Sequence, residues 1–397
     1  MNVLVINTGS SSLKFSLIDL LSEREVFKGL AECLGESAAS LSYSLEDGDK
    51  QKLSLDGACH DAALAKLVDL LEDFSLKDSI QVVGHRVVHG GPKFSSPVKI
   101  NDAVLEEIES CTSLAPLHNP ANILGIRVSQ KSFPNLPQVA VFDTAFASTM
   151  AEEVYSYAVP LELRDEHNLR RYGFHGTSHE YLNLELHRQM NWQKADKKRV
   201  LTLHLGNGCS LSSSIGGVCQ DTTMGLTPLE GLVMGTRSGS LDPGVFMYLN
   251  QTLGWDIVKI NNVLNKESGL KGLSGGVSDM RQLKSLADEG HERAQLALKV
   301  FVHRLVKEAA GAIATVAGVD ALVFSGGIGE NAAFIREELC ERLSYLGLSI
   351  DDDKNLAARF GQGGEISKDG TLPILVIPTE EELMIARHSA AVSKKDL

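Results

Sequence analysis

The feature that most limits how this chain can fold is a strand, polar turn and strand pattern that occurs twice. Residues 3–6 are apolar strand formers, Gly9 and three serines then form a turn, and residues 13–17 alternate apolar with polar side chains. Residues 200–211 repeat the pattern around a second glycine-rich turn. Such turns offer backbone N–H groups to phosphate. The two copies therefore predict a duplicated domain that binds an anionic ligand.

Composition argues against several other functions. The chain has 397 residues, enough for about two domains, and its net charge of −13 with no basic cluster disfavours nucleic acid or an anionic membrane as a partner. The six cysteines are scattered, as expected of reduced thiols in a cytoplasmic protein. The first residues do not resemble a signal peptide, and the apolar stretch at residues 309–319 is too short to span a bilayer. We therefore expect a cytoplasmic protein that acts on small molecules.

Several charged side chains are predicted to lie in turns or at strand ends, where ligands bind in α/β proteins. Arg86 lies between a glycine and a Gly-Gly turn, and Asp143 directly follows the apolar strand expected at residues 138–142. Arg237 lies in a long glycine-containing loop at residues 231–244. By position alone, the two arginines could equally be surface residues and Asp143 a turn residue at a strand end; the family resemblance described below favours ligand contacts.

Helix-start signals add a histidine to this set. Thr177 and Glu180 have the spacing of a capping box, which places His175 just before a helix N-terminus, a natural anion site. Asn119 is similarly predicted to be an N-cap, because Pro120 follows it at the first helical position.

Eight segments, in the same order along the chain, resemble motifs of the acetate kinase family, which is part of the actin, hexokinase and Hsp70 superfamily. The segments are Asn7-x-Gly-Ser-Ser-Ser, Gly84-His-Arg-Val-Val-His-Gly-Gly, Phe142-Asp-Thr-Ala-Phe, Tyr172-Gly-Phe-His-Gly-Thr-Ser-His, His204-Leu-Gly-Asn-Gly, Gly235-Thr-Arg-Ser-Gly-Ser, Gly327-Ile-Gly-Glu-Asn and Pro378-Thr-x-Glu-Glu. A single such segment is a weak signal, whereas eight in the family's order are specific. The resemblance spans essentially the whole chain.

The resemblance implies an α/β fold of two duplicated ribonuclease-H-like domains, of the actin, hexokinase and Hsp70 type. Each domain would be a mixed five-stranded sheet flanked by helices. Residues 1–146 with 380–397 would form a first domain that binds acetate and phosphate, and residues 147–379 a second domain that binds the nucleotide. ATP would lie in the cleft between the copies, and the family usually forms homodimers.

The implied activity is reversible phosphoryl transfer from ATP to acetate, giving acetyl phosphate and ADP by direct in-line transfer with Mg²⁺, or with Mn²⁺ as a substitute. A carboxylate acceptor is already ionised at pH 7, given its ordinary pKa of about 4, and needs no general base. It needs cations that hold it and cancel repulsion from the phosphate, a task that suits arginine.

Other functions remain open at this point. Propionate kinase, or another short-chain fatty acid kinase, shares every motif and is the main alternative. A sugar kinase would need polar side chains where this chain has Arg86 followed by two valines. A non-catalytic nucleotide switch would leave Arg86 and Arg237 without a purpose.

The resemblance also assigns roles to the polar residues. Arg86 would grip acetate, Arg237 would bind acetate or the transferring phosphoryl group, and His175 would hydrogen-bond that group in the transition state. Asp143 would orient arginine and substrate, or contact Mg²⁺ through water. The implied magnesium site consists of Asn7 and Glu381.

Two further sets of residues follow from the resemblance. The implied nucleotide contacts are Ser10, Ser12, Lys14, His204, Leu205, Gly206, Asn207, Gly208, Asp279, Met280, Arg281, Gly327, Ile328, Gly329, Glu330 and Asn331. The implied apolar wall around the methyl group of acetate is Val88, Leu117, Phe174 and Pro228. Core packing remains an alternative for Met280, and simple turn formation for the two serines and Lys14.

Overall fold

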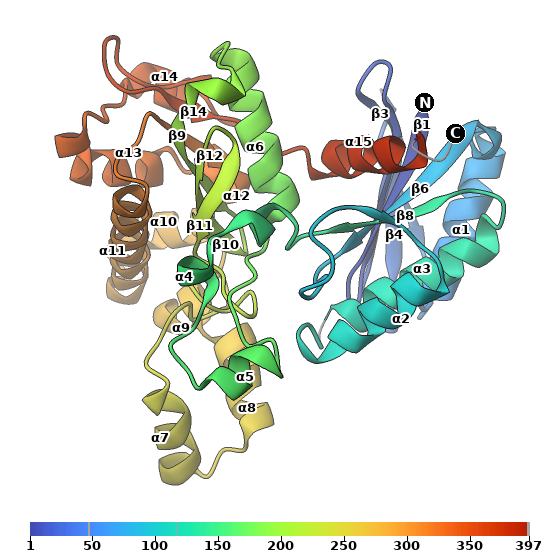
Figure 1. The fold of residues 1–397 in the computed structure, drawn as a ribbon, viewed down its shortest axis with the longest axis horizontal. Coiled ribbons are helices and arrows are strands. Elements are labelled where there is room, and N and C mark those ends of the chain that lie inside the picture. Colours follow the sequence, from blue (N-terminus) through green and yellow to red (C-terminus); the bar gives the residue numbers. More distant parts are fainter. Residues whose placement is uncertain (47, 117, 395–397) are drawn as a thin grey trace. The chain divides into compact units, whose positions relative to one another are not determined.

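The chain forms two compact units in the computed structural model, which describes residues 1–46, 48–116 and 118–394. Unit 1 consists of Met1–Ala145 with Glu380–Leu397, and unit 2 of Phe146–Thr379. In Figure 1, unit 1 comprises the blue to teal elements and the red helix α15 (Glu381–Lys394), and unit 2 the green to orange elements. Unit 1 therefore takes its last helix from the far end of the chain.

Unit 1 is built on a mixed eight-stranded sheet. Its strands are β1 (Asn2–Thr8), β2 (Leu13–Asp19), β3 (Arg24–Glu32), β4 (Ser40–Leu45), β5 (Gln51–Ser54), β6 (Ile80–Val87), β7 (Val98–Lys99) and β8 (Gln138–Phe142). They lie in the order β5-β4-β3-β2-β1-β6-β8-β7, with β1 antiparallel to β2 and parallel to β6. The first glycine-serine turn closes through a hydrogen bond of 2.8 Å from Gly9 N to Ser12 O.

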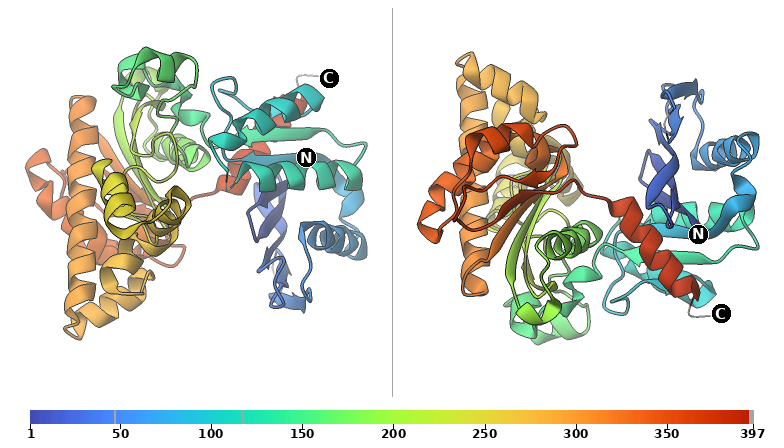
Figure 2. Two further views of the ribbon diagram at one scale, coloured as in Figure 1. Left: turned by 90° about the horizontal axis from the view of Figure 1, so that it is seen from below. Right: turned by 90° about the horizontal axis from the view of Figure 1, so that it is seen from above.

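Helices cover both faces of this sheet (Figure 2). Besides α15, the helices of unit 1 are α1 (His60–Asp73), α2 (Asp102–Ser110) and α3 (Asn119–Ser132). Val83 of β6 packs with Leu64 of α1, whereas the next residue, Gly84, faces α15. A side chain at Gly84 would clash with Ser389 and Ile385, so the glycine lets α15 lie directly on the strand.

Unit 2 contains a mixed six-stranded sheet in the order β11-β10-β9-β12-β14-β13. These strands are β9 (Arg199–Leu205), β10 (Cys209–Ile215), β11 (Val218–Thr222), β12 (Ala321–Ser325), β13 (Gly364–Glu365) and β14 (Ile374–Val376). β9 is antiparallel to β10 and parallel to β12, which is parallel to β14. The second predicted hairpin is therefore β9–β10.

The two sheets share one connectivity, an antiparallel three-strand meander followed by two parallel strands. The shared cores are β3-β2-β1-β6-β8 and β11-β10-β9-β12-β14. The prediction of a duplicated α/β fold with mixed sheets is thus confirmed. The expected count of five strands in each sheet is wrong, because the β4–β5 hairpin and the short strand β7 extend the first sheet and β13 extends the second.

The helices of unit 2 are α4 (Glu152–Tyr155), α5 (Leu161–Asp165), α6 (Gly176–Gln189), α7 (Gly244–Leu253), α8 (Ile257–Asn262), α9 (Gly269–Ser274), α10 (Met280–Asp288), α11 (Glu292–Thr315), α12 (Gly326–Asn331), α13 (Ala333–Arg342) and α14 (Asp352–Ala357), with a π-helical turn at Val263–Glu267. Leu182 and Leu186 of α6 pack against Val200 of β9 and Val323 of β12. The long helix α11 packs against β9 and β10. In Figure 1, α6 and α11 lie on opposite sides of the sheet.

Two predicted helix starts differ from those in the structure. Helix α3 begins at Asn119 itself with His118 as N-cap, and the Asn119 side chain instead bonds the backbone of His89. Helix α6 has His175 as its N-cap, in a left-handed conformation with φ of 57°. Thr177 therefore lies inside the first turn of α6 and cannot act as its cap.

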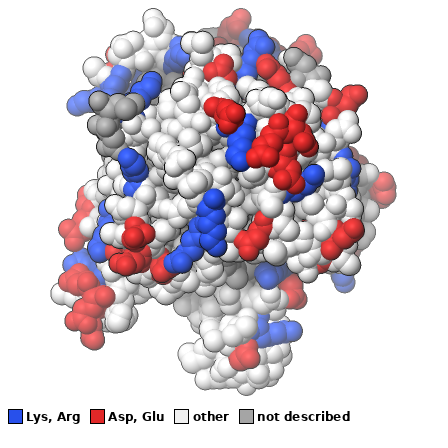
Figure 3. All heavy atoms as spheres, turned by 90° about the vertical axis from the view of Figure 1, so that its right-hand side faces the viewer, with Lys and Arg blue, Asp and Glu red and all other residues white. Residues whose placement is uncertain are grey.

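The apolar character of the helices and the charge of the surface are relevant to membrane and nucleic-acid partners. No helix within residues 1–46, 48–116 and 118–394 has the length and apolar character needed to cross a membrane. On the face drawn in Figure 3, Lys and Arg side chains are interspersed with Asp and Glu side chains. The face drawn in Figure 3 therefore carries charges of both signs.

Candidate active site

The strand ends of unit 1 bring three of the candidate residues together. Arg86, near the end of β6, donates from Nε to Asp143 Oδ1 at 3.0 Å, and its Nη2 contacts Asp143 Oδ2. Its Nη1 lies 3.4 Å from Oδ1 of Asn7, near the end of β1. Asp143 is buried, and both of its carboxylate oxygens are engaged by the guanidinium. The pair therefore fixes the orientation of Arg86.

The start of α15 adds acidic charge to this group. Burial, helped by the charges of Asp143 and Glu382, raises the pKa of Glu381 to about 7, although Arg86 opposes the shift. Burial alone would lower the pKa of Arg86, but the negative charges of Asp143 and Glu381 raise it. Lys14 forms an ion pair with Glu382, so its ammonium group is directed at α15. The turn serines Ser10 and Ser12 precede Lys14 in the same unit.

The residues implied to form an apolar wall divide between the units. Val88 is buried in unit 1, where its N–H donates to Asn122 Oδ1 at 3.0 Å. Phe174 is buried in unit 2, and Pro228 is also in unit 2, where its carbonyl accepts a bond of 3.2 Å from Arg237 Nη1. Leu117 lies outside the described residues.

The β9–β10 turn of unit 2 brings the other two catalytic candidates together. The turn closes through a bond of 2.9 Å from Gly206 N to Gly208 O, and the loop of Arg237 attaches to it through Gly235 N and Asn207 O at 3.0 Å. A Cβ atom on Gly208 would lie 3.2 Å from the His175 ring and 3.5 Å from Arg237 Nη1. A side chain at Gly208 would therefore crowd the His175 ring, and the glycine lies between the two catalytic candidates.

A cluster of histidines lies beneath this turn. The rings of His175 and His204 have centroids 4.3 Å apart, and His204 Nδ1 is 2.8 Å from Ser178 Oγ. His175 Nδ1 is 2.9 Å from Ser210 Oγ, which is also 2.7 Å from Nε2 of the buried His179. No role was predicted for His179 or Ser210 from the sequence, although His179 ends the motif that begins at Tyr172 and Ser210 lies two residues after Gly208.

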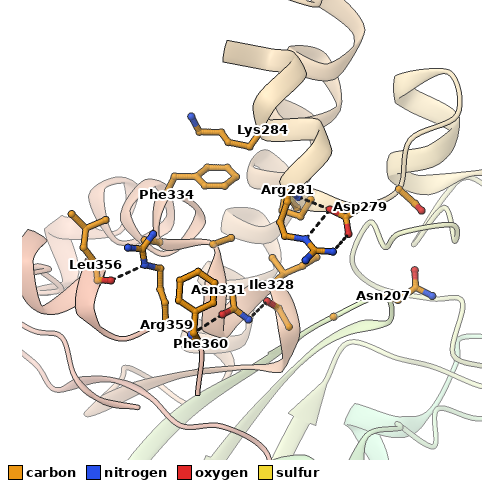
Figure 4. A pocket seen from close by; sticks show the side chains of 16 residues that line it. Asn207, Asp279, Arg281, Lys284, Ile328, Asn331, Phe334, Leu356, Arg359 and Phe360 are labelled. Carbon is orange, nitrogen blue, oxygen red and sulfur yellow. Dashed lines mark hydrogen bonds and ion pairs between the residues drawn. The ribbon is translucent and has the colours of Figure 1, made fainter. Parts of the chain in front are cut away.

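A cavity of about 900 Å³ opens in unit 2 beside the same turn (Figure 4). Its volume is in the range of small-molecule binding pockets. Eight of the implied nucleotide contacts line it, namely Gly206, Asn207, Asp279, Met280, Arg281, Gly327, Ile328 and Asn331. Asp279 caps α10 and pairs with Arg281, which lowers the pKa of Asp279 to about 2. This carboxylate therefore stays ionised at the cavity edge.

The other implied contacts of unit 2 lie off the cavity wall. They are His204, Leu205, Gly208, Gly329 and Glu330. Glu330 Oε1 accepts from Gly326 N at 2.9 Å and from Thr379 N at 3.4 Å, so it fastens the start of α12. Gly326 has φ of 76°, and a side chain there would meet Leu205 O, which only glycine avoids.

The cavity is also lined by residues that were not predicted from the sequence. They are Lys284, Phe334, Leu356, Arg359 and Phe360 among others. The Phe360 side chain is 79% exposed, and the Arg359 guanidinium lies 5.4 Å from its ring centroid. A phenylalanine directly before a glycine in a polar turn was the available signal. An aromatic wall of this kind suits a planar ligand.

The comparison with known proteins places these features in a family. A sequence model of the acetokinase family matches residues 2–387. The chain belongs to the acetokinase family. Curated acetate kinases from Chromobacterium violaceum and Escherichia coli K12 are 50% and 48% identical, over 99% and 98% of this chain and 98% of each relative. The resemblance stated from the eight motifs is thereby confirmed.

Solved structures of other acetokinases have the same fold. A propionate kinase from Francisella tularensis is 45% identical with a TM-score of 0.94, and covers 98% of this chain and 99% of its own. An acetate kinase from Porphyromonas gingivalis is 40% identical with a TM-score of 0.93, over 99% of both chains. This acetokinase thus shares its architecture with enzymes named for two different short carboxylic acids.

Proposed function

We propose that this acetokinase is a phosphotransferase that converts ATP and acetate to ADP and acetyl phosphate, reversibly and with Mg²⁺. The observation that carries the proposal is the Arg86–Asp143 pair. Both oxygens of Asp143 are bonded to the guanidinium, so the carboxylate orients a cation and is poorly placed to take a proton from a hydroxyl acceptor. A carboxylate acceptor needs the cation and no base.

The residues of unit 1 and those of unit 2 have different roles in the proposed reaction. In unit 1, Arg86 holds the acetate carboxylate. In unit 2, Arg237 and His175 flank Gly208 and neutralise the charge that develops on the phosphoryl oxygens during in-line transfer. The cavity beside Asn331 takes the nucleoside. Transfer breaks the bond between the terminal phosphorus and the bridging oxygen of ATP and forms a bond to one acetate oxygen.

The acidic group in unit 1 fits a divalent cation. Asp143, Glu381 and Glu382 outnumber Arg86 and Lys14 there, and burial with the surrounding carboxylates raises the pKa of Glu381 to about 7. No cluster of three or more His, Cys, Asp or Glu within the described part of the chain could hold a metal alone. Mg²⁺ binds with few carboxylates and keeps waters and phosphate oxygens as ligands. Asn7 and Glu381 would hold it, and Mn²⁺ would serve in the same way. When bound, the ion would offset the negative charge of the phosphates.

Propionate is the second candidate substrate, because a propionate kinase is among the solved relatives. Two curated relatives at 50% and 48% identity are named acetate kinases, which favours acetate. The methyl group of acetate would contact Val88, with Phe174 and Pro228 as further wall residues.

We further propose a cytoplasmic homodimer. The six cysteines are free thiols, which suits a reducing compartment. Helix α7 has no buried residue and no charged side chain, and Tyr248 in α7 and Val258 in α8 are 63% and 73% exposed. A second copy would cover the apolar side chains of this surface, and α7 itself carries no charge that would repel its copy. Light scattering would give twice the chain mass, and a Val258→Glu variant would give the monomer mass; a monomeric wild type contradicts the proposal.

The activity is tested by trapping the acyl phosphate with hydroxylamine. Purified protein with ATP and Mg²⁺ should give acyl hydroxamate with acetate and less with propionate and butyrate. Omitting Mg²⁺ should abolish the signal. Protein that binds ATP normally yet gives no hydroxamate with any carboxylate would overturn the proposed function.

A further inference from the structure

A buried chain of hydrogen bonds leads from His175 into the core of unit 2. His175 Nδ1 lies 2.9 Å from Ser210 Oγ, and Ser210 Oγ lies 2.7 Å from His179 Nε2. His179 Nδ1 lies 2.7 Å from Thr202 Oγ1, which donates to Ser212 O at 3.2 Å. The side chains of His179, Ser210 and Thr202 are essentially fully buried. Water therefore does not compete for these protons.

The donor and the acceptor of each hydrogen bond in this series follow from the protons that each group can offer. Ser212 O is a carbonyl and can only accept, so Thr202 uses its single hydroxyl proton there and accepts from His179 Nδ1–H. Nε2 of neutral His179 is then an acceptor, which Ser210 Oγ–H satisfies. Ser210 Oγ in turn accepts from His175 Nδ1–H. The opposite arrangement would sacrifice the bond between Thr202 and Ser212 O.

This assignment of donors and acceptors requires that the imidazole ring of His179 carries only one proton. Burial, with a further contribution from the nearby His204, lowers the pKa of His179 to about 3. At neutral pH His179 is therefore neutral, and it donates through one ring nitrogen and accepts through the other.

We propose that His179, Ser210 and Thr202 are positioning residues that keep the proton of neutral His175 on Nδ1. Nε2 of His175, the nitrogen beside Gly208, can then donate to a phosphoryl oxygen only when both nitrogens of His175 carry protons. The placement of the proton is argued from this hydrogen-bond chain, whereas its use in phosphoryl transfer rests on the proposed function. The active form of His175 in the transition state is thus the imidazolium.

The test is ¹⁵N NMR of protein labelled at histidine, since the two ring nitrogens report the tautomer directly. His175→Gln assigns the His175 signals. Above the pH at which His175 becomes neutral, the wild type should show a protonated Nδ1 and an unprotonated Nε2. Thr202→Val leaves His179 Nδ1 without an acceptor, so the chain should reverse and place the His175 proton on Nε2.

Ser213→Ala is the matched control, because Ser213 lies on the same strand, is buried, and has a hydroxyl without a partner. It should leave the His175 tautomer and the kinetics unchanged. Ser210→Ala removes the acceptor for His175 and should lower kcat about 10- to 100-fold with little change in the KM for ATP, by analogy with the outer partners of metal-ligating histidines.

Two results would overturn the proposal, namely a protonated Nε2 on neutral His175 in the wild type, or an unchanged His175 tautomer in folded Thr202→Val protein. The wild-type spectrum shows which ring nitrogen of neutral His175 carries the proton, so it tests the proposal even if the variants fail to fold. Failure of the acetate kinase assay would leave the NMR result intact, so the two failures are distinguishable.

Discussion

Asn331 and Phe360 are joined by a hydrogen bond of 2.9 Å, in which the side-chain oxygen of Asn331 accepts from the backbone N–H of Phe360. The amide nitrogen of Asn331 donates to Gly327 O at 3.0 Å. Phe360 has a left-handed backbone with φ of 56°, which costs a residue with a Cβ atom about 1–2 kcal/mol. The buried Arg336 holds the same turn through Ala358 O at 3.1 Å. The strained turn is therefore fixed from two sides and keeps an exposed aromatic ring at the cavity wall.

The first prediction concerns that ring. Phe360→Ala should raise the KM and Kd for ATP about 5- to 150-fold with kcat nearly unchanged, because stacking of a base on an aromatic side chain contributes about 1–3 kcal/mol. Calorimetry and initial rates measure the two effects. Tyr345→Ala is the control, since Tyr345 is 73% exposed and lies off the cavity wall. If the Phe360→Ala and Tyr345→Ala variants bind ATP with equal affinity, Phe360 does not contact the nucleotide.

The second prediction is that Arg237→Ala lowers kcat far more than it weakens ATP binding. The charge that Arg237 neutralises develops mainly in the transition state, and losing such a cation costs on the order of 10³-fold in rate. Steady-state kinetics and the Kd for ATP separate the two effects. Arg342→Ala, which removes only an exposed ion pair with Glu338, should change neither. Loss of ATP affinity with intact kcat would make Arg237 a nucleotide anchor.

The third prediction concerns the size of the acyl group. The wild type should use propionate with roughly a tenth to a hundredth of the efficiency of acetate, because one methylene is worth about 1–3 kcal/mol. Val88→Ala should narrow this gap, mainly through the KM for propionate. Val87→Ala is the control, since Val87 is buried in a separate core cluster. A wild type that prefers propionate would support the alternative substrate, and unchanged ratios in Val88→Ala would place the wall elsewhere.

The fourth prediction concerns stability in acid. Burial lowers the pKa of His85 to about 4, against an ordinary value of 6.5. In the unfolded chain His85 is therefore protonated below about pH 6.5, whereas in the folded protein it stays neutral down to about pH 4. The contribution to the free energy of unfolding is complete above pH 6.5 and falls by on the order of 3 kcal/mol as the pH drops to 4.

His85→Gln should flatten this pH dependence, because glutamine can still bond Gln138 but does not titrate. Both tryptophans, Trp192 and Trp255, are in unit 2, so their fluorescence does not report on His85. Hydrogen exchange of peptides from β6 measures the effect directly. Protection that falls equally in wild type and variant between pH 6.5 and 4 would show that other groups dominate.

The sequence predicted the parts of the fold that depend on local patterns and on motif order. The two hairpins, the duplicated connectivity and the family followed from short segments such as Asn7 to Ser12 and His204 to Gly208. The number of strands did not, because the count of five came from the family resemblance, whereas the β4–β5 hairpin and the short strands β7 and β13 also pair into the two sheets. The N-cap at His175 was missed because a left-handed histidine has no sequence signature.

In the candidate site, too, contacts between residues that are far apart in the sequence could not be predicted. The Arg86–Asp143 contact joins residues 57 positions apart. The family resemblance implied that Asp143 orients an arginine, whereas the motifs alone did not give the paired hydrogen bonds. His179 and Ser210 are 31 positions apart and meet because β9 and β10 pair beneath α6. Phe360 follows α14, in a stretch with no matched motif. Such partners are set by tertiary packing, which periodicity and spacing do not encode.

The position of α15 has a consequence for how the chain is made. A ribosome releases the amino terminus first, so β1, β6 and β8 emerge within the first 142 residues, while α15 begins only at Glu381. Until then the faces of those strands that α15 covers have no covering helix, and unit 2 is fully synthesised before unit 1. The amino-terminal half is therefore the last to finish folding. A chain whose synthesis stopped before residue 380 would leave the ribosome with that apolar face exposed and without Glu381.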